Sequence, residues 1–390
     1  MKENNGSFVA FTLGMLTAFG PFMTDFYLPV LPGMTEWFET TPSAMELSLT
    51  MGMLGLALGQ LFIGPQTDKY GRKGILLASM SLFCIASFCC ILAPNIIVFN
   101  LMRFVQGVGA AGGVVIARSM AVDMYSGQML MNFMALLLAI NGIGPIAAPV
   151  VGGIVGSFFN WQGVFAMLTL LGILILACSF FLRETLPVGK RRTGDFVQTY
   201  GGLSRVMGHP RFALSIAVLS SCFISFFAYI SSSTFILQNV YGMSSMKYGL
   251  CFGFNGTMLA VASYFSKKRK DLARGARNAI VLYLAGAACV ALSLWLLLPL
   301  PVLLASYIIL LLGFGLGMPV LSSLALDGEH ENAGSASAWV GAVSFLAGSL
   351  VSPVVMLGRP TVSTGLVILL FSALSCLLTQ RLYKKYLSQA

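Results

Sequence analysis

The feature that most constrains this chain is a succession of apolar blocks about 20 residues long, separated by short polar links. A helix needs about 20 residues to cross roughly 30 Å of hydrocarbon. Charged residues make up only 9% of the 390 residues and hydrophobic ones 57%, whereas soluble globular chains carry about 25% charged residues. So little charge cannot coat a water-soluble body of this size. The sequence therefore predicts an all-α polytopic membrane protein.

Twelve blocks are long enough to span a membrane. They run approximately over residues 8–31, 44–64, 75–93, 96–122, 129–157, 163–182, 212–240, 247–266, 279–298, 301–326, 334–357 and 363–382. The longest polar stretch divides them six and six, which predicts an N-terminal half 1–182, a central loop 183–211 and a C-terminal half 212–390. The stretch 1–7 lacks a basic region and a cleavage site, so we expect the first block to be retained as a span.

Basic residues indicate which side of the membrane each link occupies. The net charge is +10, but nineteen of the 23 Lys and Arg lie in alternate links, which is the positive-inside pattern of membrane proteins rather than a nucleic-acid surface. These nineteen are Lys2, Lys69, Arg72, Lys73, Arg183, Lys190, Arg191, Arg192, Arg205, Arg211, Lys267, Lys268, Arg269, Lys270, Arg274, Arg277, Arg381, Lys384 and Lys385. We predict that both termini are cytoplasmic, that the lipid bilayer is a partner, and that nucleic acid is not. The acidic stretch 327–331 breaks the pattern, but acidic residues count little in this rule.

Ionisable residues inside the apolar blocks are candidates for function, because a charge in hydrocarbon is costly. Asp25 is the only carboxylate well inside a block, and Pro29 lacks the N–H that would bond its carbonyl. Asp25 and Arg103 both lie about 9–10 Å from the outer ends of their predicted spans. We hypothesise that they face one central cavity, with Asp25 as proton carrier and Arg103 as its electrostatic partner. The alternatives are an aspartate in contact with the outer water and an arginine that snorkels to the interface.

The fifth predicted span contains two prolines and a run of glycines. Pro145 and Pro149 are four residues apart, so they share a helix face and each frees a carbonyl one turn back. Gly144, Gly152 and Gly153 permit close helix packing. A bland close-packed helix would also use glycine, but two stacked prolines favour a kink.

Several segments resemble motifs of the Major Facilitator Superfamily. The link from Gly64 to Lys73 resembles its signature loop, and the family implies that Asp68, Arg72 and an acid ending span four, here Asp123, form a cytoplasmic gate that opens during transport. Arg103-Phe-Val-Gln106-Gly resembles a motif that the family links to proton transfer. The fifth span resembles the antiporter signature, which separates exporters from importers. The resemblance implies two six-helix halves that rock around a central cavity.

A narrower resemblance is to the Bcr/CflA drug-resistance transporters. It is carried by Asp25-Phe-Tyr-Leu-Pro-Val-Leu-Pro32, by Ala117-Arg118 with Asp123-Met-Tyr125, by Glu184-Thr-Leu-Pro187 and by the region 229–244. Val122 departs from the pattern, which usually has Arg there. This family implies proton-driven export of small, chemically varied compounds, antibiotics included, across the bacterial inner membrane. Protons and a small-molecule substrate are therefore the expected partners.

Aromatic and polar side chains within the spans are candidates for the wall of a substrate cavity. The candidates are Phe22, Phe26, Tyr27, Gln106, Asn141, Phe226, Tyr229, Phe235 and Asn255. Each aromatic taken alone is more often in contact with lipid or another helix. The eight cysteines and two histidines show no metal-ligand spacing, so we expect no cofactor and no metal. We also expect a monomer.

Three alternatives stay open at this stage. An importer, or an exporter of metabolites such as amino acids, would have the same fold, although the antiporter-like fifth span argues against an importer. A membrane-embedded enzyme would need clustered His, Asp, Glu or Cys near an interface, and His209 and His330 have no such neighbours in sequence. A non-transporting receptor would not need an intramembrane Asp and Arg. We therefore predict a transporter and not an enzyme.

Overall fold

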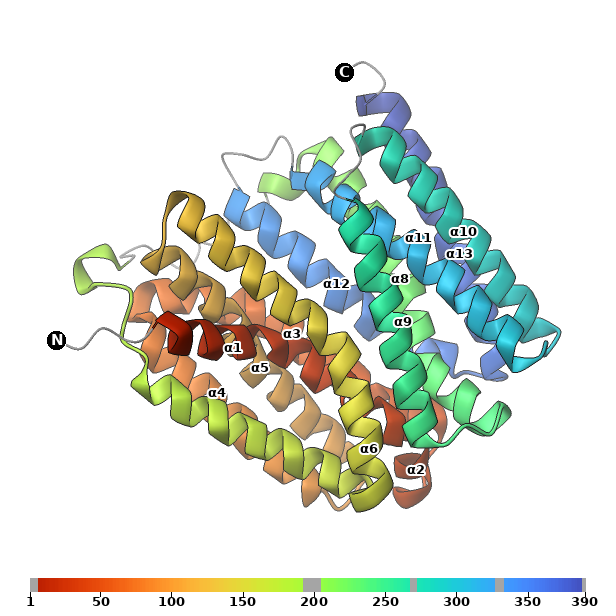
Figure 1. The fold of residues 1–390 in the computed structure, drawn as a ribbon, viewed down its shortest axis with the longest axis horizontal. Coiled ribbons are helices and arrows are strands. Elements are labelled where there is room, and N and C mark those ends of the chain that lie inside the picture. The colour runs from red at the N-terminus through yellow and green to blue at the C-terminus, as the bar shows by residue number, and fades with distance from the viewer. Residues whose placement is uncertain (1–5, 192–204, 267–271, 327–332, 388–390) are drawn as a thin grey trace. The chain divides into compact units, whose positions relative to one another are not determined.

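The computed structural model describes residues 6–191, 205–266, 272–326 and 333–387, and its regular elements in those ranges are helices (Figure 1). The predictions based on Lys2, Arg192, Lys267–Lys270 and the acidic stretch 327–331 lie outside these residues. The chain divides into two compact units. The first comprises residues 1–194 and 244–253, and the second comprises residues 195–243 and 254–390.

The first unit is built from α1 (Gly6–Asp25), α2 (Leu31–Trp37), α3 (Pro42–Tyr70), α4 (Arg72–Ile91), α5 (Ile96–Met124) and α6 (Gly127–Phe181). Polar side chains mark two of the helix starts. The Thr41 hydroxyl accepts a hydrogen bond from the Ala44 N–H at 3.2 Å, and Asn95 Oδ1 accepts one from the Val98 N–H at 3.0 Å. Each satisfies a donor that the first helical turn would otherwise leave unpaired.

Helix α6 covers both the fifth and sixth predicted spans. It is 55 residues long, far more than the about 20 residues that one membrane crossing needs. At Asn160 the backbone leaves helical geometry (φ 56°, ψ −169°), and this residue divides α6 into two helical segments. Asparagine tolerates positive φ better than most residues. The kink lies in the link that the sequence predicts between residues 157 and 163.

The second unit contains α8 (Pro210–Phe235), α10 (Leu272–Trp295), α11 (Leu300–Leu326), α12 (Ala333–Val355) and α13 (Pro360–Leu382). A short π-helical turn, Ile236–Val240, extends α8. Helix α9 (Ser245–Ser266) begins in the first unit and ends in the second. Within the second unit α10 packs against α11 and α13, and α8 packs against α12 and α13.

Within the described residues, nine helical segments are long and apolar enough to cross a membrane. One of the nine, Ile140–Phe181, contains the Asn160 kink. Helix α9 falls outside the nine, and the apolar part of α12 is the shorter segment Trp339–Val355. The predicted all-helical membrane architecture is confirmed, whereas the count of twelve crossings stays a prediction.

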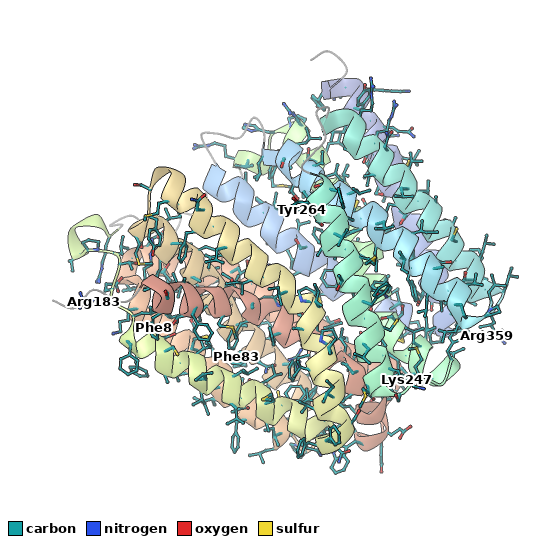
Figure 2. The ribbon with its side chains drawn as sticks, in the orientation of Figure 1. Phe8, Phe83, Arg183, Lys247, Tyr264 and Arg359 are labelled. Atoms are coloured by element: carbon teal, nitrogen blue, oxygen red, sulfur yellow. The ribbon has the colours of Figure 1, made fainter. Side chains whose placement is uncertain are left out.

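Glycine brings the helices of the first unit into close contact. A Cβ on Gly55 of α3 would collide with the backbone carbonyl oxygen of Phe104 on α5, and a Cβ on Gly107 would collide with that of Gly52. Small residues allow this approach because lipid supplies no hydrophobic force between helices. Buried aromatic rings fill other gaps, and the rings of Phe19 and Phe83 meet edge-on with their centres 4.9 Å apart. Arg183, in contrast, is exposed beyond the end of α6 (Figure 2).

Candidate functional site

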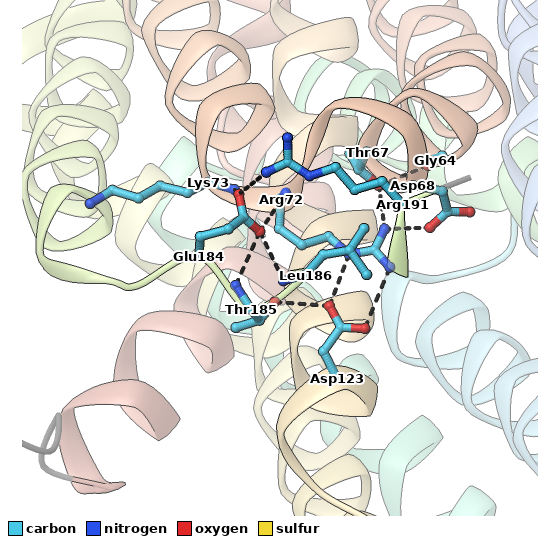
Figure 3. Close-up of polar contacts among 10 residues, drawn as sticks. All are labelled: Gly64, Thr67, Asp68, Arg72, Lys73, Asp123, Glu184, Thr185, Leu186 and Arg191. Carbon is cyan, nitrogen blue, oxygen red and sulfur yellow. Dashed lines mark hydrogen bonds and ion pairs between the residues drawn. The ribbon is translucent and has the colours of Figure 1, made fainter. Parts of the chain in front are cut away.

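Arg72 is the centre of a charged cluster where the ends of α3, α4 and α5 meet (Figure 3). Its Nη1 donates to Asp68 Oδ1 at 2.5 Å and to the Thr67 hydroxyl at 2.7 Å. Its Nε donates to Asp123 Oδ2 at 3.0 Å. The Arg72 side chain is 8% exposed and that of Asp123 15%, so this pair is screened less than a surface pair. The structure thus brings together the three residues expected to form the gate.

Glu184, which the sequence analysis did not assign to any site, holds the start of α4. Gly71 adopts φ +98°, which favours glycine, and provides no side-chain cap. The Glu184 carboxylate instead accepts from the N–H of Arg72 at 2.9 Å and of Lys73 at 3.1 Å (Figure 3). A carboxylate is favoured at this position because a helix N-terminus carries partial positive charge. The only signal in sequence was its place in the segment that resembles the Bcr/CflA family.

Further hydrogen bonds hold the segment after α6 to the cluster. The Thr185 hydroxyl donates to Asp123 Oδ2 at 2.8 Å, and the backbone N–H groups of Thr185 and Leu186 donate to Glu184. Burial raises the pKa of Glu184, but hydrogen bonds from the N–H groups of Leu186, Arg72, Lys73 and Thr185 outweigh it and leave the pKa below its usual range. The carboxylate is therefore ionised at neutral pH.

Arg103 of α5 is fully buried, and its hydrogen bonds connect three helices. Nη1 donates to Gln106 Oε1, and Nη2 donates to the backbone carbonyl of Met23 on α1 at 2.9 Å. Gln106 in turn donates to the Ser87 hydroxyl on α4 at 2.7 Å. The guanidinium lies 4.2 Å from the centre of the Tyr27 ring, a cation–π contact. An arginine this buried is not snorkelling to an interface.

Asp25 is the last residue of α1 and is 5% exposed. It lies two residues beyond the Met23 carbonyl that binds Arg103. In the described part of the chain, Arg103 forms no ion pair with Asp25; its polar partners are an amide and a backbone carbonyl. Arg103 thus binds the backbone of α1 two residues before Asp25, but the two side chains are not bonded to each other.

The glycine and proline residues of the fifth predicted span pack against neighbouring helices of the first unit. A Cβ on Gly144 would lie 2.9 Å from the Pro21 side chain, and one on Gly152 would collide with the Phe26 carbonyl. A Cβ on Gly153 would lie 2.8 Å from the Ser245 carbonyl. Pro145 and Pro149 lie within α6 itself. The motif therefore provides close contact with α1 and with the start of α9.

Most cavity candidates in the first unit are buried. Phe26, Tyr27 and Gln106 are fully buried, whereas Phe22 and Asn141 are half-buried. The Phe22 and Phe26 rings stack with centres 6.0 Å apart. Asn141 lines a hollow of about 10 Å³, room for one water molecule, and its other lining residues are Thr17, Arg118, Met134 and Leu137.

In the second unit, three of the candidates form one cluster. Phe226 is half-buried, and its ring centre lies 6.3 Å from that of Tyr229. Asn255 donates a hydrogen bond to the Tyr229 hydroxyl at 2.9 Å, and both are buried. Phe235 is also buried and directly precedes the π-helical turn. This cluster of rings with an amide suits a ligand that is mostly apolar.

The described residues include no group of three His, Cys, Asp or Glu side chains that would hold a metal ion. Their eight cysteines are unpaired thiols, half of them buried.

Relatives of known name cover most of the chain. The MFS-type transporter YdgK of Bacillus subtilis is 33% identical over 365 residues, 90% of this chain and 89% of that protein. The bicyclomycin resistance protein homolog of Haemophilus influenzae is 27% identical over 372 residues, 91% of this chain and 90% of that protein. The multidrug resistance protein MdtL of Escherichia coli is 27% identical over 334 residues, 84% of this chain and 82% of that protein.

Solved structures share the fold. A bacterial homolog of the human lysosomal transporter Spinster, in an inward-facing conformation, has a TM-score of 0.78 at 15% identity and covers 97% of this chain and 98% of its own. The D-xylose–proton symporter has a TM-score of 0.74 at 16% identity and covers 96% and 97%. Residues 10–353 match the Major Facilitator Superfamily itself. With the helical fold and the Arg72 and Arg103 networks in place, this match shows that the chain belongs to the Major Facilitator Superfamily and is a transporter rather than an enzyme.

Proposed function

We propose that the protein is a proton-coupled antiporter that exports small drug-like molecules or metabolites by alternating access. The observation that carries this proposal is the pair of buried ionisable residues in two membrane helices, Asp25 at 5% exposure and Arg103 at 0%. Buried charges in spans are expensive and mark ion or substrate pathways. The names of the bicyclomycin resistance homolog and MdtL support drug export as the direction and class of transport.

In this proposal Asp25 takes up and releases the proton. Arg103 acts on it through α1, because the guanidinium holds the Met23 carbonyl one half-turn before Asp25. The cluster of Asp68, Arg72 and Asp123 closes the cytoplasmic side and breaks when that side opens. Pro145 and Pro149, with the glycines around them, let α6 bend against α1.

In this proposal each unit has its own candidates for contact with substrate. In the first unit the candidates are Phe22, Phe26 and Asn141. In the second they are Phe226 and Tyr229, and Asn255 donates a hydrogen bond to Tyr229. The protein acts as a monomer in the bacterial inner membrane, with both termini cytoplasmic, and binds small molecules and protons but not nucleic acid. No cofactor takes part.

A susceptibility panel tests the drug-export proposal. Wild type and Asp25→Asn are expressed in an efflux-deficient bacterium and challenged with bicyclomycin, chloramphenicol and ethidium. Wild type is expected to protect against at least one compound and Asp25→Asn against none, with equal amounts of both proteins in the membrane. Protection against no compound by wild type contradicts drug export, and full protection by Asp25→Asn contradicts the proton role of Asp25.

Direction is tested in everted vesicles, where the cytoplasmic side faces out. Ethidium added to vesicles with an acid interior is expected to accumulate inside while protons leave, and an uncoupler is expected to abolish this. Movement of ethidium and protons in the same direction would instead indicate a symporting importer. An exporter of metabolites such as amino acids would exchange protons for those compounds and not for ethidium.

A further inference from the structure

Glu46 is a buried acid that neither the sequence analysis nor the proposed mechanism uses. It is the fifth residue of α3 and is 0% exposed. Both of its carboxyl oxygens lack a hydrogen-bond partner. Transferring an unpaired ionised carboxylate from water into such surroundings is strongly unfavourable. The carboxyl group is therefore neutral in this conformation, with its proton in place.

We propose that Glu46 is a second proton-binding site of the transporter, protonated in this conformation and connected to Arg103 through Tyr27. The proposal rests on the proposed proton-coupled transport. It assigns a proton to a residue on α3, whereas the proposed function assigns one to Asp25 on α1.

Tyr27 provides the connection. Its hydroxyl shares a hydrogen bond with the Ser48 hydroxyl at 3.0 Å, two residues along α3 from Glu46. The Arg103 guanidinium packs against its ring at 4.2 Å. One tyrosine therefore contacts both Arg103 and the turn of α3 that carries Glu46.

Arg103 has one N–H group that donates to no acceptor. Its Nε is buried without an acceptor, although its other nitrogens are bonded to Gln106 and to the Met23 carbonyl. A buried N–H without an acceptor is unfavourable. The acid thus lacks a donor, and the guanidinium that packs against Tyr27 has an N–H that lacks an acceptor. Loss of the Glu46 proton would change the pairing of these groups.

The proton step is simple. The O–H bond of the Glu46 carboxyl breaks, the proton leaves to water, and the negative charge stays on the carboxylate without electron transfer. The carboxylate then requires a donor, and Arg103 has an N–H without an acceptor. Movement of Arg103 toward Glu46 weakens its bond to the Met23 carbonyl and so releases α1 next to Asp25. Deprotonation of Glu46 therefore changes the surroundings of Asp25.

The helices packed against α3 bring few other ionisable groups to this end. Asp25 ends α1, Glu36 is exposed on α2, Cys90 is buried on α4 near Arg103, and Arg103 itself is on α5. The remaining charged residues of these helices lie toward their other ends: Asp68, Lys69, Arg72, Lys73, Arg118 and Asp123. The positive charge available to a Glu46 carboxylate at this end is that of Arg103.

Infrared spectroscopy of the purified full-length protein tests the protonation directly and requires no substrate. The spectrum of wild type minus that of Glu46→Gln at pH 7 is expected to contain the carbonyl band of a protonated carboxylic acid. Glu46→Asp keeps a shorter acid and is expected to shift this band, which preserves the test if Glu46→Gln does not fold. Glu36→Gln, an exposed acid on the same side, is expected to leave the band unchanged. A difference spectrum with only carboxylate bands would overturn the proposal.

Ethidium transport in everted vesicles is the second test. It distinguishes failure of the Glu46 proposal from failure of the proposed function. If wild type exchanges ethidium for protons, Glu46→Gln is expected to lose the dependence on the pH gradient, while Glu36→Gln keeps it. Full pH-gradient dependence in Glu46→Gln would overturn the role of Glu46. If wild type exchanges no protons, the proposed function fails, and the infrared result alone decides whether Glu46 binds a proton.

Discussion

The guanidinium Nε of Arg72, the first residue of α4, lies 3.0 Å from Oδ2 of Asp123, the penultimate residue of α5. The same guanidinium binds Asp68 on α3, so one side chain joins the ends of three helices. In the proposed mechanism, opening of the transporter at this end breaks these bonds.

Asp123→Asn removes the charge from this pair while keeping its size. Charged hydrogen bonds contribute about 1.5–3 kcal/mol, and a value in that range is the expected loss because Arg72 and Asp123 are mostly buried. The measurement is thermal unfolding of the purified protein, with Glu39→Gln, an exposed acid, as the control. An unfolding temperature equal to that of wild type in Asp123→Asn would contradict the role given to the pair.

Glu184 makes this end of the protein sensitive to acid. Its folded-state pKa lies below the ordinary value of 4.5, because four backbone N–H groups outweigh the effect of burial. The stabilisation is therefore fully present above about pH 4.5 and is lost as pH falls through the lower folded-state value. Stability measured from about pH 6 to about pH 3 is expected to fall in wild type.

Glu184→Gln keeps an acceptor oxygen but does not titrate, so its stability is expected to fall less over the same range. Glu39→Gln removes an exposed acid that makes no such bonds and is expected to follow wild type. Identical pH profiles for Glu184→Gln and wild type would show that Glu184 does not carry the effect.

Arg103→Lys keeps the positive charge but loses the planar group that binds Gln106, the Met23 carbonyl and the Tyr27 ring together. An ammonium ion cannot reproduce that geometry. We expect ethidium transport to be lost while the protein still inserts and folds. Arg359→Lys, at an exposed arginine of the second unit, is the matched control. Transport by Arg103→Lys at the wild-type rate would mean that charge alone suffices.

Gly55→Ala tests the close packing of α3 on α5. The added methyl group would overlap the Phe104 carbonyl oxygen, and overpacking of this kind typically costs about 1–3 kcal/mol. Gly74→Ala is the control, since a Cβ there meets no atom within 4 Å and alanine is the better helix former. Thermal unfolding is expected to separate the two variants, and a Gly55→Ala protein as stable as Gly74→Ala would contradict the packing argument.

Local properties of the sequence determine the membrane architecture. Apolar block length sets which segments cross, and every predicted span lies largely on a helix. The signature loop identifies Asp68 and Arg72, and the resemblance adds Asp123, because these motifs are read from short stretches of chain. The link between the fifth and sixth predicted spans can also be read from the sequence. In the structure α6 runs through this link, and Asn160 is the residue there that leaves helical geometry.

Tertiary structure alone decides which buried groups meet. Depth along a span can be counted from sequence, and it places Asp25 and Arg103 at similar depth, but counting does not give the rotation of each helix about its axis. Rotation directs Arg103 to the Met23 carbonyl instead of to Asp25. Glu46 lies near the start of a predicted span, a position that predicts contact with water. In the folded protein, packing against other helices buries it completely. Glu184 caps a helix that begins 112 residues earlier, and such a bond exists only when the folded chain brings the two ends together.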